Sequence, residues 1–449
     1  MCDTTSTFPI ERREKGYRVV KSLFPVLRQD RIFTLYQIFQ QPSNMCSWVQ
    51  IVAMGLIVHE LTGSAVSLGV SLLLGSIPQA ILGLWGGVIA DHYPRRTVML
   101  VTQFQMLLLA AVMSVLVGFQ VVPVWSLYVS IALTSVLRAF NQGAQRGYVG
   151  EMLVGWKNPD QEDAPNSGCK EPSWEDALAS DDKEPNRKDA LTFDAKASQV
   201  TWVLASALTG LFASQGDWFW VFVLNAASFV PILWLIWRGP YGREYPVARN
   251  EERLTLLGMW QQIKSLVDAV EHLKDSAARE LTLFCVTTFA LGTVGASMPV
   301  IVQEMHGGKA YTVLYAAQAV GSLLACFAMR WFRQGSGWLL FCGASAVYGL
   351  VLPMWWEALA VIALFLLLDV TTMRTKVFLQ HKTPDALCGR VSSVYALINT
   401  GGWGVSGWIA GMLIPEVGVT ATELGGAALG ALGVGIVRLK FGPRERDAK

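Results

Sequence analysis

The chain has 449 residues, of which 52% are hydrophobic and only 16% are charged. A soluble domain carries about 25% charged residues, so this composition argues against a soluble, secreted or disordered protein. The formal net charge of +2 gives no support for a nucleic-acid partner, and the seven scattered cysteines form neither a disulfide framework nor a set of zinc ligands. The composition therefore predicts an all-α protein that crosses a membrane many times, because a helix satisfies its own backbone hydrogen bonds in lipid.

Twelve segments are long and apolar enough to cross a bilayer, which requires about 20 mostly apolar residues. The ninth and tenth form one apolar run, which we divide at a tight hairpin marked by Pro353 and Glu357. The predicted spans are 33–58, 66–90, 97–118, 123–143, 193–213, 218–237, 281–303, 311–332, 337–352, 357–374, 391–414 and 420–438.

These spans predict two pseudo-symmetric six-helix bundles. Residues 155–188 interrupt the first bundle with an acidic, proline-containing insertion that is too polar to order itself. Residues 254–273 have apolar positions at helical spacing, which fits either a helix on the membrane surface or a solvated linker with one helix. In chain order we expect a cytoplasmic segment (1–32), the first bundle (33–237), a cytoplasmic linker (238–280), the second bundle (281–438) and a basic tail (439–449).

The basic residues predict the orientation of the spans, because Lys and Arg are retained on the cytoplasmic side of a membrane. With both termini in the cytoplasm, only Lys309 of the 36 basic residues falls in a predicted outer loop. Residues 11–31 are basic and no cleavage site follows them, so we expect no signal peptide. The pattern predicts a multi-pass protein of the plasma membrane with an even number of spans.

The most specific local pattern follows the second span, where residues 86–96 read Gly-Gly-Val-Ile-Ala-Asp-His-Tyr-Pro-Arg-Arg. This pattern resembles the loop between helices 2 and 3 of the major facilitator superfamily. It is most similar to the form found in the subgroup of enterobactin-type siderophore exporters and macrolide-efflux proteins. Residues 27–62, 259–281 and 384–395 resemble the same subgroup, and the similarity extends over about 28–155 and 189–440.

The resemblance implies that Asp91 docks near the start of helix 11 and stabilises one of two access states. Glycines allow two helices to approach closely, and a carboxylate at a helix end can face the positive N-terminus of a neighbour and pair with arginines. The alternative is a short cytoplasmic turn whose basic residues only set the topology. The candidate latch residues are Gly86, Gly87, Asp91, Arg95, Arg96, Gly389 and Arg390. The eleventh predicted span, 391–414, is also rich in glycine, with Gly407 and Gly411 at a spacing that allows close helix packing.

Four charged residues in the predicted spans are candidates for proton coupling: Arg138, Asp194, Asp369 and Glu60. A charge near the centre of a bilayer costs a few kcal/mol on insertion scales, so it usually faces a cavity or a partner. Each residue also has a simpler explanation. Asp194 lies near a helix N-terminus, Asp369 precedes Arg374, and Glu60 closes its helix at the outer face.

The first span is unusually polar. Five residues share one helical face at a spacing of three and four, which suits a water-filled cavity that holds an amphipathic ligand. The alternative is hydrogen bonding between helices with no ligand. The candidate cavity residues are Gln37, Gln40, Gln41, Asn44 and Trp48, with Gln79, Asn225 and Asn399 on other helices.

No catalytic motif, metal-ligand set or phosphate-binding loop accompanies the spans, which argues against an enzyme and against an ATP-driven pump. The resemblance implies secondary active export of a small amphipathic organic molecule, such as an antibiotic or a siderophore, by proton antiport and alternating access. We expect the substrate and the lipid bilayer as partners, a monomer, and no cofactor beyond the proton gradient. Uptake or facilitated transport is the alternative, and a non-transporting receptor or scaffold is a third reading.

Overall fold

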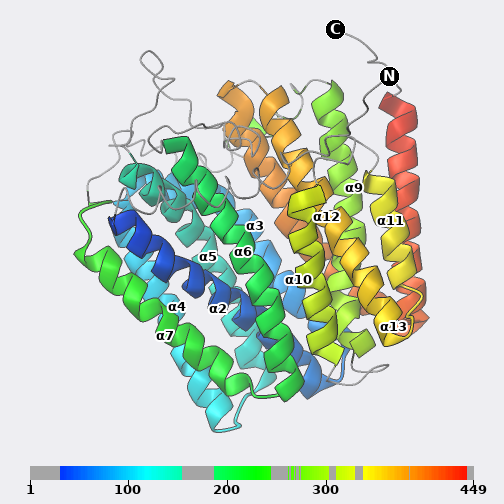
Figure 1. Cartoon of the computed structure of the whole chain (residues 1–449), viewed down its shortest axis with the longest axis horizontal. Helices are drawn as coiled ribbons and strands as arrows, with labels where there is room; N and C mark the ends of the chain where they lie inside the picture. Colours follow the sequence, from blue (N-terminus) through cyan, green and yellow to red (C-terminus); the bar gives the residue numbers. More distant parts are fainter. Residues whose placement is uncertain are drawn as a thin grey trace, which may run out of the picture.

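Helices account for the whole described structure, which is a computed structural model. The described residues are 31–153, 187–243, 275–302, 310–328, 337–383 and 385–441, with a few isolated positions between 261 and 273, and they contain no strand (Figure 1). The predicted insertion at 155–188 lies outside these residues except at 187 and 188. Of the predicted amphipathic helix at 254–273, most residues also lie outside them, and six of those described between 261 and 270 are helical. The helices are α2 (Arg31–Thr62), α3 (Ala65–His92), α4 (Arg95–Gly118), α5 (Val124–Met152), α6 (Arg187–Gln215), α7 (Trp218–Arg238), α9 (Asp275–Ile301), α10 (Ala310–Ala328), α11 (Gly337–Tyr348), α12 (Met354–Lys382) and α13 (Asp385–Phe441).

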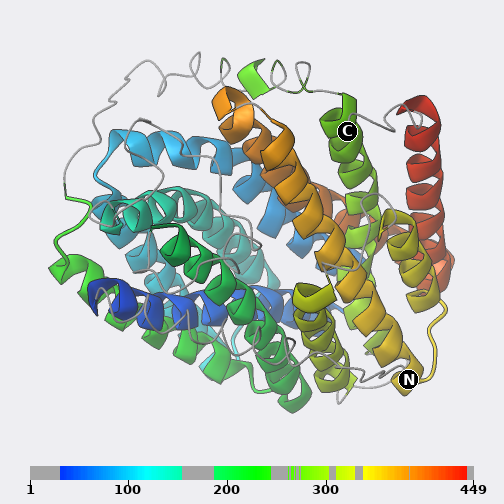
Figure 2. The ribbon, with the colours of Figure 1, turned by 45° about the horizontal axis from the view of Figure 1, so that its top comes forward.

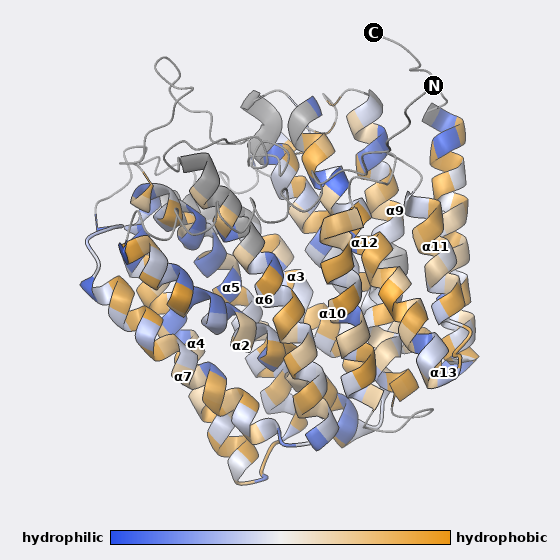
Figure 3. Ribbon diagram, in the orientation of Figure 1, coloured by the Kyte–Doolittle hydropathy of each residue, from blue (hydrophilic) through white to orange (hydrophobic). Residues whose placement is uncertain are grey.

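Nine of the described helices, with α13 counted once, are long and apolar enough to cross a membrane. This confirms the predicted all-helical, multi-pass architecture. The helix α11 falls short with 12 residues, and α6 is not among the nine. Hydrophobic residues cover most of the helices, whereas hydrophilic residues gather at the helix ends and along α2 and α5 (Figure 3).

Several helices are longer than the apolar spans predicted from the sequence. The predicted span 123–143 corresponds to Val124–Met152, and the predicted span 357–374 corresponds to Met354–Lys382. Hydropathy marks only the residues that can lie in hydrocarbon, and a helix continues beyond them until a residue stops it. Pro353 precedes α12, so the predicted hairpin is correct, but Glu357 lies inside the first turn of α12 and not in the loop.

The last helix contains one break. Gly418 has φ 83° and ψ 164°, a conformation that glycine adopts without the steric penalty of a side chain. The break divides α13 into two arms, which correspond to the predicted spans 391–414 and 420–438.

The helices form two groups in space, which Figures 1 and 2 show from two directions. We call α2–α7 the N-terminal group and α9–α13 the C-terminal group. The groups meet mainly where α3 packs against α13 and where α6 packs against α10. One end of the bundle carries the turn at Gly63 between α2 and α3, and we call it the Gly63 face. The other end carries Arg95 at the start of α4, and we call it the Arg95 face.

Glycines let α3 and the first arm of α13 touch through their backbones. A Cβ added to Gly69 would lie 3.1 Å from Trp408 Cα and 3.2 Å from Gly411 Cα. A Cβ added to Gly411 would lie 2.6 Å from the carbonyl oxygen of Ala65. The predicted close packing at Gly407 and Gly411 is therefore confirmed, because side chains at this interface would separate the helices.

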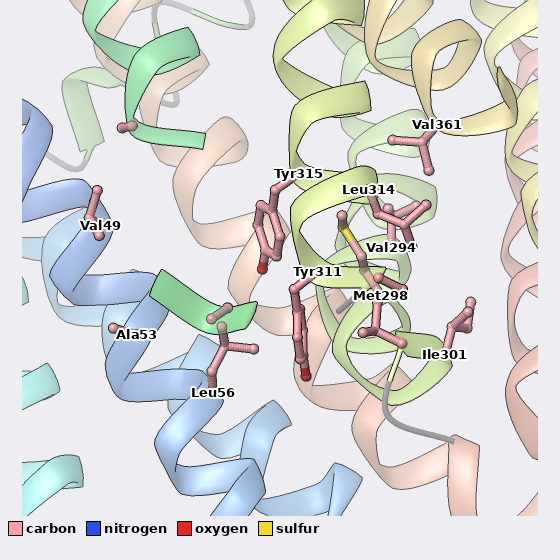
Figure 4. Packing of buried hydrophobic residues seen from close by; sticks show 14 of the residues in the cluster. Val49, Ala53, Leu56, Val294, Met298, Ile301, Tyr311, Leu314, Tyr315 and Val361 are labelled. Carbon is pink, nitrogen blue, oxygen red and sulfur yellow. The ribbon is translucent and has the colours of Figure 1, made fainter. Parts of the chain in front are cut away.

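Both contacts between the groups lie toward the Gly63 face. On α3 the close approaches run from Ala65 to Ala80, in the part of the helix next to the Gly63 turn. On α6, the carbonyl of Gly210 accepts a hydrogen bond of 3.0 Å from Thr312 Oγ1, near the start of α10. A hydrophobic cluster fills the same region, where Tyr311 and Tyr315 of α10 lie between α2 and α9 (Figure 4).

The α3–α13 contact predicts opposite effects for two glycine substitutions in one helix. Gly411→Ala is expected to lower the thermal unfolding midpoint in detergent, because overpacking a tight contact costs about 1–3 kcal/mol. Gly425→Ala is the matched control, since nothing lies within 4 Å of a Cβ at this exposed position. It is expected to leave the midpoint unchanged or to raise it, because alanine favours a helix by about 0.5–1 kcal/mol over glycine. Equal effects of the two substitutions would contradict the contact.

Candidate functional site

The polar face of α2 lies at the centre of the N-terminal group. Gln37 and Gln40 are buried, with 4% and 2% of their surface exposed, whereas Gln41, Asn44 and Trp48 are half-buried. Their side chains are linked along the helix, since Gln41 Nε2 donates to Gln37 Oε1 at 2.8 Å and Gln40 Nε2 donates to Asn44 Oδ1 at 2.9 Å. The sequence spacing therefore did place these residues on one continuous face.

This face is hydrogen-bonded to two neighbouring helices on either side of α2. Gln37 Nε2 donates to Asp194 Oδ1 of α6 at 2.7 Å, and Thr201 Oγ1 of α6 donates to Gln41 Oε1 at 3.0 Å. From α4, Gln103 Nε2 donates to Gln40 Oε1 at 3.2 Å. The buried amides thus join helices, while the half-buried members of the face keep part of their surface open.

A third helix joins α2 further along. Asn225 of α7 is 2% exposed, and its Nδ2 donates to Gln50 Oε1 at 2.6 Å. Ser47 Oγ donates to Asn225 Oδ1 at 3.2 Å. Asn225, which the sequence proposed for the cavity, therefore has both of its amide atoms engaged in helix contacts.

Trp48 connects this face to a buried cation. The guanidinium of Arg138 on α5 lies 4.2 Å from the centre of the Trp48 ring, and Arg138 is only 8% exposed. The ring of Trp202 on α6 meets Trp48 edge to face, with the ring centres 4.6 Å apart. No carboxylate pairs with Arg138 within the described residues, and its Nε has no hydrogen-bond partner there. A cation held only by an aromatic face keeps most of its capacity to bind an anion or a carbonyl oxygen.

The remaining cavity candidates lie elsewhere. Gln79 of α3 donates through Nε2 to Gln142 Oε1 of α5 at 3.4 Å, one helical turn from Arg138. Asn399 is half-buried on the first arm of α13, in the other group. The structure therefore gathers most of the predicted cavity residues in the N-terminal group.

The two arginines of the 86–96 segment bind helix ends in their own group. Arg95 Nη1 donates to the carbonyl of Gly147 at 3.1 Å and to Glu151 Oε1 of α5 at 2.8 Å. Arg96 Nε donates to the carbonyl of Ile236 at 2.9 Å, at the end of α7. The C-terminal end of a helix carries a partial negative charge, so these arginines stabilise the ends of α5 and α7.

The other predicted latch residues are only partly described. Gly86 touches α5, where the carbonyl of Ala139 leaves no room for a side chain. Asp91 lies in the last turn of α3 and Gly389 in the first turn of α13, but their side-chain surroundings are outside the description, as are those of Gly87. Arg390 is exposed at the start of α13.

The other charged candidates occupy different depths. Asp369 lies midway along α12, half-buried beside Ser322 of α10 and Tyr395 of α13. Glu60 is exposed at the Gly63 face, where Trp218 Nε1 donates to Glu60 Oε2 at 2.9 Å. Arg138, Asp194, Asp369 and Glu60 therefore form no single cluster.

Sequence reasoning missed three buried acids in the C-terminal group: Glu280, which is 3.7 Å from Arg279, and the more deeply buried Glu357 and Glu423. Glu357 and Glu423 are both 0% exposed, and neither forms an ion pair within the described residues. Glu423 lies inside the predicted span 420–438, and a carboxylate within an apolar span was the signal that could have identified it. Glu357 was used only to mark the hairpin.

A double-mutant cycle tests the contact between Trp48 and Arg138. Trp48→Leu, Arg138→Met and the double variant are expected to show a coupling of about 1–2 kcal/mol in the free energy of unfolding, because a desolvated cation–π contact has this strength. Trp234 and Arg238 provide the matched control pair, exposed on α7 with the guanidinium 5.7 Å from the ring centre. We expect their coupling to be below about 0.5 kcal/mol. Equal coupling in the two pairs would contradict the buried contact.

Comparison with known proteins identifies relatives by sequence and by fold. The chain matches the family described as transmembrane secretion effector over residues 21–160 and 167–449. It is 29% identical over 96 residues to macrolide efflux protein A of Streptococcus pyogenes, and this segment is 21% of the chain and only 24% of that protein. A POT family transporter in complex with 5-aminolevulinic acid has a TM-score of 0.64 at 14% identity, covering 92% of this chain and 96% of the other. For the nucleoside transporter NupG the TM-score is 0.62 or 0.63 in two structures, and identity is 11%. At these identities the structures are alike in fold alone.

Proposed function

The chain belongs to the transmembrane secretion effector family of the major facilitator superfamily, and from this premise we propose that it exports a small amphipathic organic molecule in exchange for protons. As a member of this family it is a multi-pass membrane transporter and not an enzyme, as the sequence predicted. The direction of transport, the coupling ion and the substrate class are the proposal.

The proposed architecture has twelve spans in two pseudo-symmetric bundles. It adds α6, α11 and the second arm of α13 to the helices that qualify by length and composition. Two features support the symmetry. The contact of α3 with α13 has a counterpart in the contact of α10 with α6. In addition, α5 and α12 both follow a proline, both have 29 residues, and each carries one charge near its middle, Arg138 and Asp369.

In the proposed orientation the Arg95 face is cytoplasmic, because basic residues are retained on that side. The groups then meet at the outer side, along the glycine contacts of α3 and α13. A state closed outside can load substrate from the cytoplasm, which is the order that export requires. Alternating access would then break these contacts and form new ones near the Arg95 face.

The observation that carries the proposal is the buried guanidinium of Arg138 on the ring of Trp48, beside the half-buried Gln41 and Asn44. An amphipathic molecule can place an apolar surface against Trp48 and Trp202, and its oxygen atoms toward Arg138 and the amides. The relative named macrolide efflux protein A supports a macrolide as the first probe.

The proposed proton-coupling residue is Asp369. It is half-buried midway along α12, and a carboxylate at this depth binds and releases protons readily when its exposure changes. Asp194 is hydrogen-bonded to Gln37 and so responds to any ligand that displaces the α2 amides. Arg138 and Glu60 are the remaining candidates.

Export by cells that produce the protein tests the site and the coupling together. Trp48→Leu is expected to raise the half-saturating macrolide concentration about tenfold, since loss of an aromatic contact of about 1.4 kcal/mol changes binding tenfold. Asp369→Asn is expected to leave export independent of a protonophore. Trp355→Leu is the control, because Trp355 is 70% exposed. Wild-type export that ignores a collapsed proton gradient contradicts antiport, and accumulation in place of loss of the macrolide indicates uptake.

The proposed latch is tested by Asp91→Asn, which removes the negative charge and keeps the shape of the side chain. We expect export to fall at least tenfold, because the neutral amide stabilises the positive end of a helix less than a carboxylate does. Asp217→Asn is the control, since Asp217 precedes α7 at the opposite face and asparagine caps a helix equally well. Unchanged export in Asp91→Asn would contradict the latch, and residues 86–96 would then serve only to set the membrane topology.

A further inference from the structure

Glu357 and Glu423 flank the loop between α11 and α12, close to the Gly63 face. Glu357 Oε2 accepts a hydrogen bond of 2.9 Å from the backbone N–H of Leu352 in this loop. The side chain of Glu423 packs against Gly349, where an added Cβ would lie 2.5 Å from Glu423 Cβ. Both carboxyl groups therefore lie buried against the same loop, Glu423 at Gly349 and Glu357 at Leu352.

In each carboxyl group, one oxygen accepts a hydrogen bond within the described residues and the other does not. Thr293 Oγ1 of α9 donates to Glu423 Oε2 at 3.0 Å, while Glu423 Oε1 and Glu357 Oε1 are buried and have no hydrogen-bond partner among the described residues. Ser345 Oγ of α11, which is 0% exposed, lies beside Glu423. Buried polar atoms are normally hydrogen-bonded, so a carboxyl oxygen that lacks a donor is a natural place for a bound proton.

The groups that face this pair are neutral or acidic. Tyr348 of α11 faces both carboxyl groups, and its hydroxyl lies 3.3 Å from Ser297 Oγ of α9. Tyr315 of α10 faces Tyr348 from the other side. Within the described residues no Lys, Arg or His forms an ion pair with either carboxyl group. Two adjacent buried carboxylates without a cation cannot both be ionised, because each charge is desolvated and repelled by the other.

We propose that Glu357 and Glu423 together form a proton-binding site of the transporter. A proton from water at the Gly63 face adds to a carboxylate oxygen of the pair and later returns to water, with no other bond changed. The pair titrates as one unit, so the bound proton belongs to both residues. This inference rests on the proposed function in one respect, since it assigns the antiported proton an entry point at the outer side.

The position of the pair links proton binding to the contact between the groups. Tyr315 and Tyr311 of α10 are stacked with ring centres 6.3 Å apart, and their rings lie beside α2 of the N-terminal group (Figure 4). Tyr315 also faces Tyr348. Gly210 of α6 touches both tyrosines. A change of charge at the pair therefore acts next to the α6–α10 contact and biases the closure of the Gly63 face.

Infrared difference spectroscopy on the purified full-length protein tests the site without any transport. In a pH titration in the Asp369→Asn background, which removes the other proposed proton site, the protein is expected to show the C=O stretch of a buried carboxylic acid. Glu423→Gln and Glu357→Gln should each remove or shift this band, because only the pair can hold the shared proton. Glu416→Gln is the matched control, since Glu416 is an exposed acid of α13 before the break. Tyr348→Phe is expected to shift the titration midpoint.

A band that persists unchanged in both glutamine variants overturns the inference. Loss of the band on addition of sodium at constant pH also overturns it, because the site would then bind a metal cation. If the glutamine variants do not fold, Ser345→Ala must shift the titration midpoint of the band, and an unshifted midpoint overturns the inference. The two proposals can fail separately. If the titrating band depends on Glu423 but export does not depend on the proton gradient, the proton site is supported and antiport is contradicted.

Discussion

Hydrocarbon offers no hydrogen bonds, so every polar side chain within a span must find its partner inside the protein. This constraint organises the N-terminal group around α2. Gln37, Gln40 and Gln50 reach α6, α4 and α7 in turn, and the contacts of Gln40 and Gln50 are between buried groups. The arrangement of helices in this group depends on these contacts, because an amide that lost its partner in lipid would cost several kcal/mol.

Where polar contacts are lacking, the helices approach through glycine. In the contact of α3 with α13, backbone meets backbone at Gly69 and Gly411, and small or apolar side chains fill the rest. Such an interface has no directional bonds to break, which suits a contact that must open and close. The hydrogen bonds within the N-terminal group thus hold its helices together. The glycine contact between α3 and α13 is the surface along which the two groups can separate.

Polar groups left incomplete by this arrangement are the basis of the functional proposals. In the part of the chain that the structure describes, Arg138 lies on the Trp48 ring without a carboxylate, and Glu357 and Glu423 each have one buried oxygen without a partner. Arg138 lies in the N-terminal group, where we propose that the substrate binds. Glu357 and Glu423 lie in the C-terminal group, where we propose that the proton binds. A transporter that exchanges the two needs the substrate site and the proton site to respond to one movement. Tyr315 of α10, which faces Tyr348 at the proton site, also touches Gly210 of α6.

The sequence by itself determined the helical multi-pass class, the family and the shared face of α2, because these follow from composition, periodicity and local motifs. It also placed the α11–α12 hairpin at Pro353. Only the tertiary structure decided what each polar residue meets. The arginines of the 86–96 segment bind the ends of α5 and α7, and Glu357 and Glu423 come together from separate helices. Pairing between distant segments depends on how helices pack, and no local pattern of residues encodes that.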